Sequence, residues 1–168
     1  MNDSFILRDR IWREQNERVT LSSIATLAET TEGREDKEEK GPFRTDFERD
    51  RDRIIHSKSF RRLKHKTQVF INPDGDHYIT RMTHTLQVTQ VGRSIAKTLG
   101  LNPDLTEAIC LGHDVGHSPF GHTGEDVLNE LLDGGWSHSE NSVKIFSSIE
   151  PLNLTTVSYT HLTLPTKA

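Results

Sequence analysis

The sequence of 168 residues has only one cysteine, Cys110. An intrachain disulfide is therefore excluded, and we expect a reducing, cytoplasmic setting. The N-terminal stretch MNDSFILRDR lacks a long apolar core, and no segment approaches the roughly 18 apolar residues that a membrane-spanning helix needs. We accordingly expect a soluble protein that is not exported and has no membrane partner.

Hydrophobic residues are also scarce, at 32% of the chain. This length suffices for one domain with a core of its own, but so low a content predicts exposed segments as well. The net charge of -4 argues against a general nucleic-acid-binding surface. Local basic clusters could still bind phosphates, so binding of nucleic acid is not excluded but is not indicated either.

Three helices are expected in the first hundred residues. The first covers about residues 5–18 and leads into a densely charged segment up to residue 42, which we interpret as a solvated linker. Thr45 and Glu48 have the spacing of a capping box, and strong helix formers follow to residue 63. A third helix is expected from Thr83 to a stop at Gly100, with one apolar stripe facing the core. The stripe consists of His84, Val88, Val91, Ile95 and Leu99.

Three further helices are expected between residues 103 and 149. Asn102 followed by Pro103 is a typical helix start, and this helix should end near Gly112. Thr123 is the expected cap of the next helix, and the last one covers residues 139–149. The β-branched run at 66–71 and the turn at 72–76 suggest at most a small hairpin near 67–80. The expected fold class is therefore all-α.

The last stretch, residues 151–168, is rich in threonine and has no helical apolar stripe. We predict that it does not continue the series of amphipathic helices and interpret it as foreign to the fold, after a truncation. His161 within it receives no functional weight. The expected organisation is an N-terminal helix and charged linker at 1–42, a partial helical domain at 43–150, and the tail at 151–168.

Residues 111–125, LGHDVGHSPFGHTGE, concentrate polar side chains that can carry chemistry. Taken singly, a His–Asp pair is most often a turn residue beside a surface histidine, and a lone histidine such as His84 is most often a core residue. Imidazole and carboxylate together suit a divalent cation of the iron, manganese, magnesium or zinc kind. The density of this segment favours a functional site. Its members are His113, Asp114, His117, His122 and Glu125.

Three segments, 43–70, 80–96 and 112–125, together with a weaker one at 134–146, carry a family resemblance. The chain resembles the HD-domain deoxynucleoside triphosphate triphosphohydrolases, the deoxyguanosine-triphosphatase-like family. The resemblance implies an HD-domain helical bundle. It also implies metal-dependent hydrolysis of a deoxynucleoside triphosphate to the deoxynucleoside and tripolyphosphate.

The resemblance also implies a role for each matching residue. The metal ligands would be His84, His113 and Asp114, the catalytic residues His117, His122 and Glu125, and the substrate-binding residues Gln68, Arg81 and His138. Within this set, Arg81 would contact phosphate and Gln68 the sugar 3'-hydroxyl. The family's fourth metal ligand, a downstream aspartate, has no counterpart in this sequence.

The implied cofactor is a divalent cation, Mg, Mn or Fe, and the implied partners are a deoxynucleoside triphosphate and further copies of the intact family member. Because the fourth ligand and a long C-terminal region are lacking, we interpret the chain as a C-terminally truncated fragment with impaired activity. Two alternatives remain open. One is another HD-domain nucleotide phosphohydrolase, and the other is a non-catalytic, nucleotide-binding regulatory module.

Overall fold

A computed structural model describes residues 7–66 and 79–163 of the chain. This part has eight α-helices and no β-strand, only one isolated antiparallel bridge between Arg34 and Thr155. The all-α prediction is therefore confirmed, whereas most of the hairpin expected near 67–80 lies outside the described residues. The helices are α1 (Arg10–Thr20), α2 (Asp46–His56), α3 (Lys58–Arg62), α4 (Arg81–Leu99), α5 (Pro103–Gly112), α6 (Gly121–Leu131), α7 (His138–Lys144) and α8 (Thr156–Thr163).

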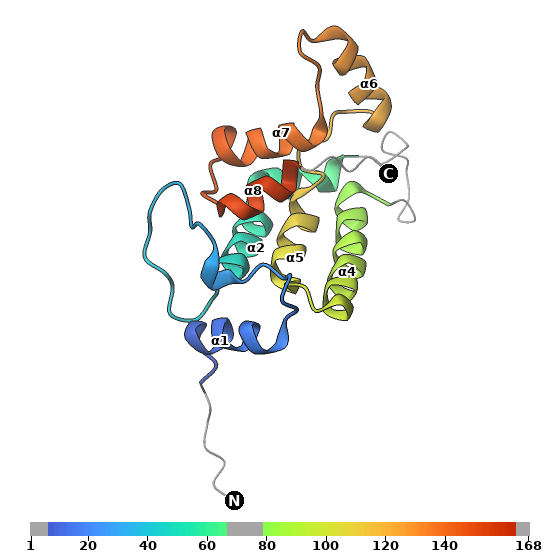
Figure 1. The fold of residues 1–168 in the computed structure, drawn as a ribbon. Helices are drawn as coiled ribbons and strands as arrows, with labels where there is room; N and C mark the ends of the chain where they lie inside the picture. The colour runs from blue at the N-terminus through green and yellow to red at the C-terminus, as the bar shows by residue number, and fades with distance from the viewer. Residues whose placement is uncertain (1–6, 67–78, 164–168) are drawn as a thin grey trace, which may run out of the picture.

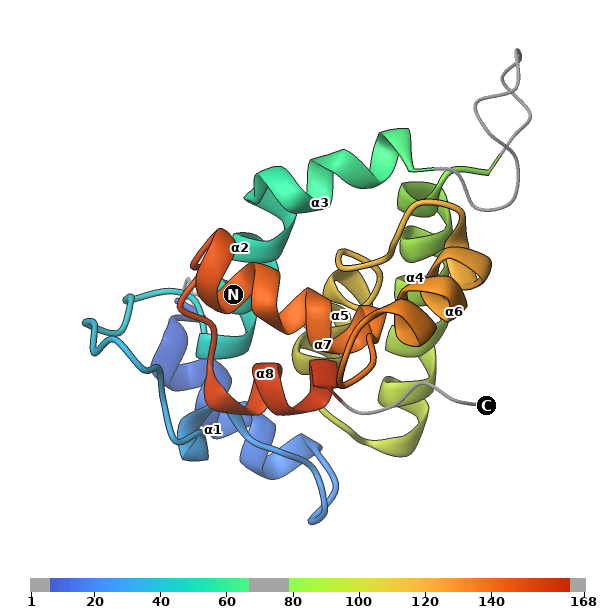
Figure 2. The ribbon, with the colours of Figure 1, turned by 90° about the horizontal axis from the view of Figure 1, so that it is seen from above.

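Helix α5 lies between α2 and α4 and contacts both (Figure 1). Seen from above, α7 and α8 lie next to each other (Figure 2), and in the first view α6 stands out from the other helices (Figure 1). The main core is formed where these helices meet. Its buried members are Ile54, Phe60, Leu63, Ala108, Leu111, Val115, Phe146, Leu154 and Leu162. No described helix combines the length and the apolar character that crossing a membrane would require.

Several helix ends follow from local side-chain caps. The Thr45 side chain accepts a hydrogen bond from the backbone N–H of Glu48, and the Glu48 carboxylate accepts one from the backbone N–H of Thr45, which confirms the capping box. Asn102 caps α5, and Gly100 ends α4 in the left-handed conformation at φ 67°. These three ends were expected from the sequence.

Several helix boundaries differ from the prediction, and two of the differences have a clear local cause. The helix expected to run to residue 63 breaks at Ser57, whose hydroxyl caps α3 by accepting from the backbone N–H of Phe60. Helix α6 begins at Gly121, before the expected cap Thr123. The reason is that Phe120 takes the left-handed conformation, at φ 66° and ψ 19°, and turns the chain into the helix there.

The predicted core-facing stripe of α4 is wrong, since Val91, Ile95 and Leu99 are exposed in the described structure. Helix α4 instead turns a face of small residues toward α5. A Cβ atom added at Gly92 would lie 2.8 Å from Cys110 Sγ, so the two helices approach closely at this point. Close backbone approach therefore outweighs burial of the larger apolar side chains. The small residues of this face are Thr85, Thr89, Gly92 and Ala96.

The tail contributes to the fold, although no helix was assigned to it from the sequence. Helix α8 lies within it, and Leu154 and Leu162 are buried in the main core. Asp50 of α2 accepts hydrogen bonds from Thr155 N (3.0 Å), Thr155 Oγ1 (2.7 Å) and Ser158 Oγ (2.7 Å). Long-range contacts thus stabilise a helix that has no amphipathic pattern of its own. The boundaries expected at residues 42 and 150, and the foreign origin of the tail, stay predictions.

The charged linker is less solvated than expected. The Arg34 side chain is buried, and it pairs with Asp50, Glu38 and Asp46. It also donates to the backbone oxygen of Asn153 at 2.6 Å, so the linker and the segment before α8 are attached to the same face of α2.

Candidate active site

The first group of site residues lies where α4 and α5 come together. His84 is in the first turn of α4, His113 caps the C-terminal end of α5, and Asp114 follows it. One candidate ligand atom from each residue lies within 4.8 Å of the other two. The structure therefore brings together the three residues predicted as metal ligands. Among the described residues, no fourth one joins this group.

The hydrogen bonding of His113 suits a metal ligand. Its Nδ1 lies 2.6 Å from the backbone oxygen of Cys110, and since a carbonyl oxygen can only accept, Nδ1 must carry the proton. The other nitrogen, Nε2, then presents a lone pair and lies 3.4 Å from Asp114 Oδ1. A backbone carbonyl on the far nitrogen is the usual support of a metal-binding imidazole.

Asp114 is buried, and its Oδ2 atom forms an ion pair with the side chain of Arg81. Arg81 Nη1 lies 2.9 Å from Asp114 Oδ2, and both side chains are almost fully shielded from solvent. Burial alone would raise the pKa of the Asp114 carboxyl, but the charges of His113 and Arg81 outweigh this and lower the pKa below its usual value. Asp114 is therefore a carboxylate at neutral pH. The predicted phosphate-binding role of Arg81 stays a prediction.

A second group gathers around Glu125 of α6. His138 Nδ1 lies 2.9 Å from both Glu125 oxygens, and its backbone N–H donates to Oε1 at 3.0 Å. His122 Nδ1 is farther from Glu125 Oε2, at 3.3 Å, and the His122 side chain is 79% exposed. The His117 and His138 rings are stacked, with centroids 4.7 Å apart. The four predicted residues thus form one cluster, in which Glu125 pairs more closely with His138 than with His122.

His117 is the buried member of this cluster, and its Nδ1 has no hydrogen-bond partner among the described residues. Burial, and next the charge of Arg81, lower its pKa to about 4. The ring is therefore neutral at pH 7. For Glu125, burial alone would raise the pKa of the carboxyl, but its hydrogen bonds to His138 and the nearby charge lower it. In this cluster, the Glu125 carboxylate therefore contacts the imidazole rings of His122 and His138.

The loop between the two groups is held by residues that the sequence analysis did not assign to the site. Ser142 Oγ lies 3.0 Å from His113 O, 2.9 Å from His138 O and 2.8 Å from Gly116 N, from which it accepts. A Cβ atom at Gly116 would lie 2.2 Å from Ser142 N, so only glycine fits there. Lys66 Nζ donates to Val115 O and His117 O. Of Ser142, Gly116 and Lys66, only Gly116 lies within the 111–125 segment that the sequence analysis singled out.

Two further residues were named in the sequence analysis, and neither is among the described members of the two groups. Gln68 lies outside the described residues. His161, which received no functional weight, hydrogen-bonds the backbone oxygen of Val157 at 2.8 Å and belongs to neither group.

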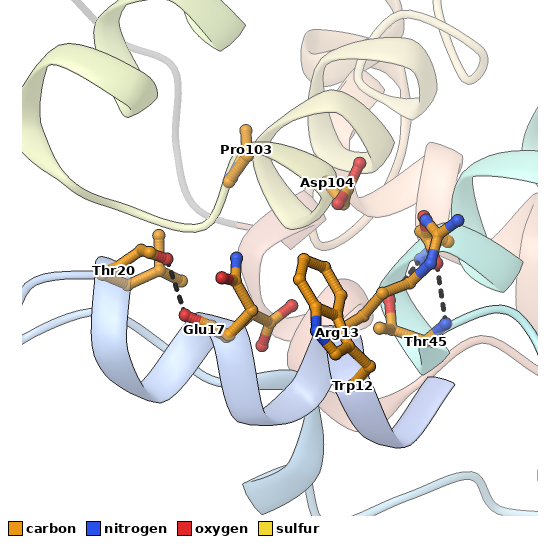
Figure 3. Close-up of a pocket in the computed structure, with 10 residues that line it drawn as sticks. Trp12, Arg13, Glu17, Thr20, Thr45, Pro103 and Asp104 are labelled. Atoms are coloured by element: carbon orange, nitrogen blue, oxygen red, sulfur yellow. Dashed lines mark hydrogen bonds and ion pairs between the residues drawn. The ribbon is translucent and has the colours of Figure 1, made fainter. Parts of the chain in front are cut away.

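A separate cavity of about 180 Å³ lies between α1 and the start of α5. Trp12 and Glu17 of α1 face Pro103 and Asp104 across it (Figure 3). Burial raises the pKa of Glu17 and of Asp104. None of the predicted site residues lines this cavity.

Comparison with known proteins places this arrangement in a family. The HD domain family matches residues 81–166, which contain both histidine groups. A relative from Caldanaerobacter subterraneus is 60% identical over 146 residues, covering 84% of this chain and 43% of the relative. One from Clostridium tetani is 55% identical over 157 residues, covering 91% and 44%. Both are called deoxyguanosinetriphosphate triphosphohydrolase-like proteins.

A third relative with the same description, from Desulfatibacillum aliphaticivorans, is 53% identical and is covered over 42% of its length. The chain thus spans less than half the length of the curated relatives it matches. The residues shared with the family include the whole segment from α4 to α8. The chain belongs to the HD-domain family.

Proposed function

We propose that the chain supplies the catalytic half of a metal-dependent phosphohydrolase that cleaves deoxynucleoside triphosphates to the deoxynucleoside and tripolyphosphate. The observation that carries this proposal is the presence of two polar groups, each of which includes residues of the short segment from His113 to His117 between α5 and α6. The His84, His113 and Asp114 group lies on one side, and the His117, Glu125 and His138 group on the other. The names of the relatives support this substrate class.

His84, His113 and Asp114 would hold a divalent cation, Mg, Mn or Fe. Their fit rests on the convergence of their ligand atoms, on the protonated Nδ1 of His113 and on the ionised carboxyl of Asp114. Such a cation, when bound, polarises phosphoryl oxygens and offsets the charge that develops on them. Three protein ligands leave coordination positions for water and substrate.

Glu125 orients the histidines of the second group. Its carboxylate accepts from His138 Nδ1 and lies within reach of His122 Nδ1, so each ring is protonated on the nitrogen that faces Glu125. His122, the exposed ring, is placed to take a proton from an attacking water, which is the water-activating role we assign to it with Glu125. His138 would contact the substrate beside it.

His117 would act on the phosphates or on the departing deoxyribose oxygen. Because the imidazole is neutral at pH 7, a hydrogen bond to a phosphate oxygen suits it better than donation of a full proton. Substrate contacts by Arg81, and by Gln68 to the sugar 3'-hydroxyl, complete the proposed set. We further propose that the intact protein is a cytoplasmic homo-oligomer.

Product analysis of a hybrid protein tests the proposal. In the hybrid, this chain supplies the 146 residues matched in the Caldanaerobacter relative. With Mn²⁺ and each deoxynucleoside triphosphate, the hybrid is expected to release tripolyphosphate, and His122→Ala is expected to abolish the release. The unaltered relative is the positive control. Release of pyrophosphate or of single phosphates would overturn the proposed reaction.

The 168 residues alone are expected to show little or no turnover, because the fourth ligand that the resemblance implies has no counterpart among the described residues and its loss should weaken cation binding. Tripolyphosphate release by the chain alone at the rate of the hybrid would contradict this expectation. Nucleotide binding without turnover in the hybrid would instead favour the regulatory-module alternative.

A further inference from the structure

Arg81 and Asp114 form a buried ion pair that divides the two oxygens of the carboxylate. Oδ2 accepts from Arg81 Nη1 at 2.9 Å, whereas Oδ1 lies 3.4 Å from His113 Nε2. Arg81 is 4% exposed and Asp114 is 5% exposed. One oxygen is therefore held by the protein, and the other faces the candidate ligand nitrogen of His113.

Arg81 lies on the same helix turn as the candidate metal ligand His84. Arg81 and His84 are three residues apart in the first turn of the helix, so their side chains lie on neighbouring positions of one helix face. The same turn thus supplies one candidate ligand, His84, and the partner of another, Asp114. The backbone N–H of Arg81 also donates to Lys66 O at 3.1 Å. The side chain of Lys66 in turn donates to the backbone oxygens of Val115 and His117, so this turn of α4 is connected to the loop that follows Asp114.

Burial gives the contact between Arg81 and Asp114 an energetic basis. A buried carboxylate without a partner loses several kcal/mol of solvation, and a lone buried guanidinium loses a similar amount. Arg81 Nε is already buried without a hydrogen-bond partner among the described residues, so the ion pair with Asp114 compensates the burial of the guanidinium charge.

We propose that Arg81 is a positioning residue for Asp114. By holding Oδ2, it keeps the carboxylate plane in the orientation that directs Oδ1 toward His113 Nε2, and in this way it sets the affinity of the site for a divalent cation. This role rests on the ligand set of the proposed function. It does not depend on which nucleotide is the substrate.

Cation binding without nucleotide tests this role. The protein would be titrated with Co²⁺, following the visible absorption of the bound ion, for the unaltered chain, Arg81→Gln and Arg81→Lys. We expect Arg81→Gln to bind Co²⁺ about 10–100-fold more weakly, as is usual when the outer partner of a metal ligand is removed. Arg81→Lys keeps the charge and one donor on a shorter side chain, so its affinity should fall between the other two.

Arg93→Gln is the matched control. Arg93 is on the same helix and pairs with Glu107 at the surface, so its loss removes one positive charge without touching Asp114. Its Co²⁺ affinity and absorption spectrum should equal those of the unaltered chain. Circular dichroism would verify that each variant is folded.

The possible outcomes separate the role of Arg81 from the wider function. Co²⁺ binding by Arg81→Gln that is as tight as, or tighter than, that of the unaltered chain overturns the positioning role, and Arg81→Lys decides in the same way if Arg81→Gln does not fold. Absence of Co²⁺ binding in the unaltered chain overturns the ligand set and this role together. Cation binding that depends on Arg81, in a protein whose hybrid releases no tripolyphosphate, overturns only the proposed reaction.

Discussion

Asp50 is expected to be the most sensitive single position for stability, because it joins three segments that are far apart in the chain. Its carboxylate is fully buried, pairs with Arg34, and accepts three hydrogen bonds from Thr155 and Ser158. In Asp50→Asn, Arg34 would keep its buried charge but lose its closest counter-charge. The side-chain amide of the new asparagine would also replace a carboxylate that accepts from Thr155 and Ser158. Breaking a buried pair in this way costs about 3–5 kcal/mol.

That loss is a large share of the roughly 5–15 kcal/mol by which a domain is usually stable. Urea unfolding followed by circular dichroism would measure it as a lower midpoint. Asp52→Asn on the same helix is the control, since Asp52 pairs with Arg44 and Arg51 in partly exposed positions and its loss should cost at most about 1 kcal/mol. A change within about 1 kcal/mol for Asp50→Asn would refute the structural role assigned to this network.

Three further predictions use the same unfolding measurement. Leu162→Ala should cost about 2–5 kcal/mol because it opens a cavity in the main core, whereas Leu131→Ala, at a position 75% exposed, should change stability by less than about 0.5 kcal/mol. Gly116→Ala should cost at least about 1–3 kcal/mol, since its Cβ would overlap Ser142 N and His138 O, and Gly41→Ala, with open space around it, should be nearly neutral. Stability should fall as the pH is lowered from about 6.5 to about 4, because in this range His117 takes up a proton in the unfolded chain but not in the folded one. With a chelator present, the stability of His117→Gln should fall less over the same range. An equal fall in the variant and the unaltered chain would contradict the buried neutral ring.

Helix ends that depend on neighbouring residues could be predicted from the sequence. The cap by Asn102 and the proline after it define the start of α5, and the reciprocal bonds of Thr45 and Glu48 define the start of α2. Each of these interactions joins residues within a few positions of one another. The residue types and their spacing therefore contain the whole signal.

Features that depend on distant contacts could not be predicted in this way. Thr155 hydrogen-bonds a carboxylate 105 positions earlier, so nothing within residues 151–168 indicates that α8 has a place in the fold. The α4 stripe was assigned to the core because large apolar residues are usually buried. Helix packing instead used the small residues around Gly92, and periodicity alone does not show which of two faces meets a neighbour.

The candidate site shows the same division. His84, His113 and Asp114 were grouped by their chemistry and by resemblance, and the structure places their ligand atoms together. The pairing of Arg81 with Asp114 spans 33 positions and was not expected. Lys66 and Ser142 were not assigned to the site because a single lysine or serine has no pattern in a sequence that would distinguish it from a surface residue.

Ser142 has a consequence for how this protein could change over evolution. One buried hydroxyl is in contact with the carbonyl oxygens of His113 and His138 and with the amide of Gly116. Alanine at this position would leave the Gly116 amide without its acceptor, and a larger residue would press on a loop that has no room for even a Cβ at Gly116. We therefore expect positions 116 and 142 to vary together, or not at all, among proteins that keep both histidine groups.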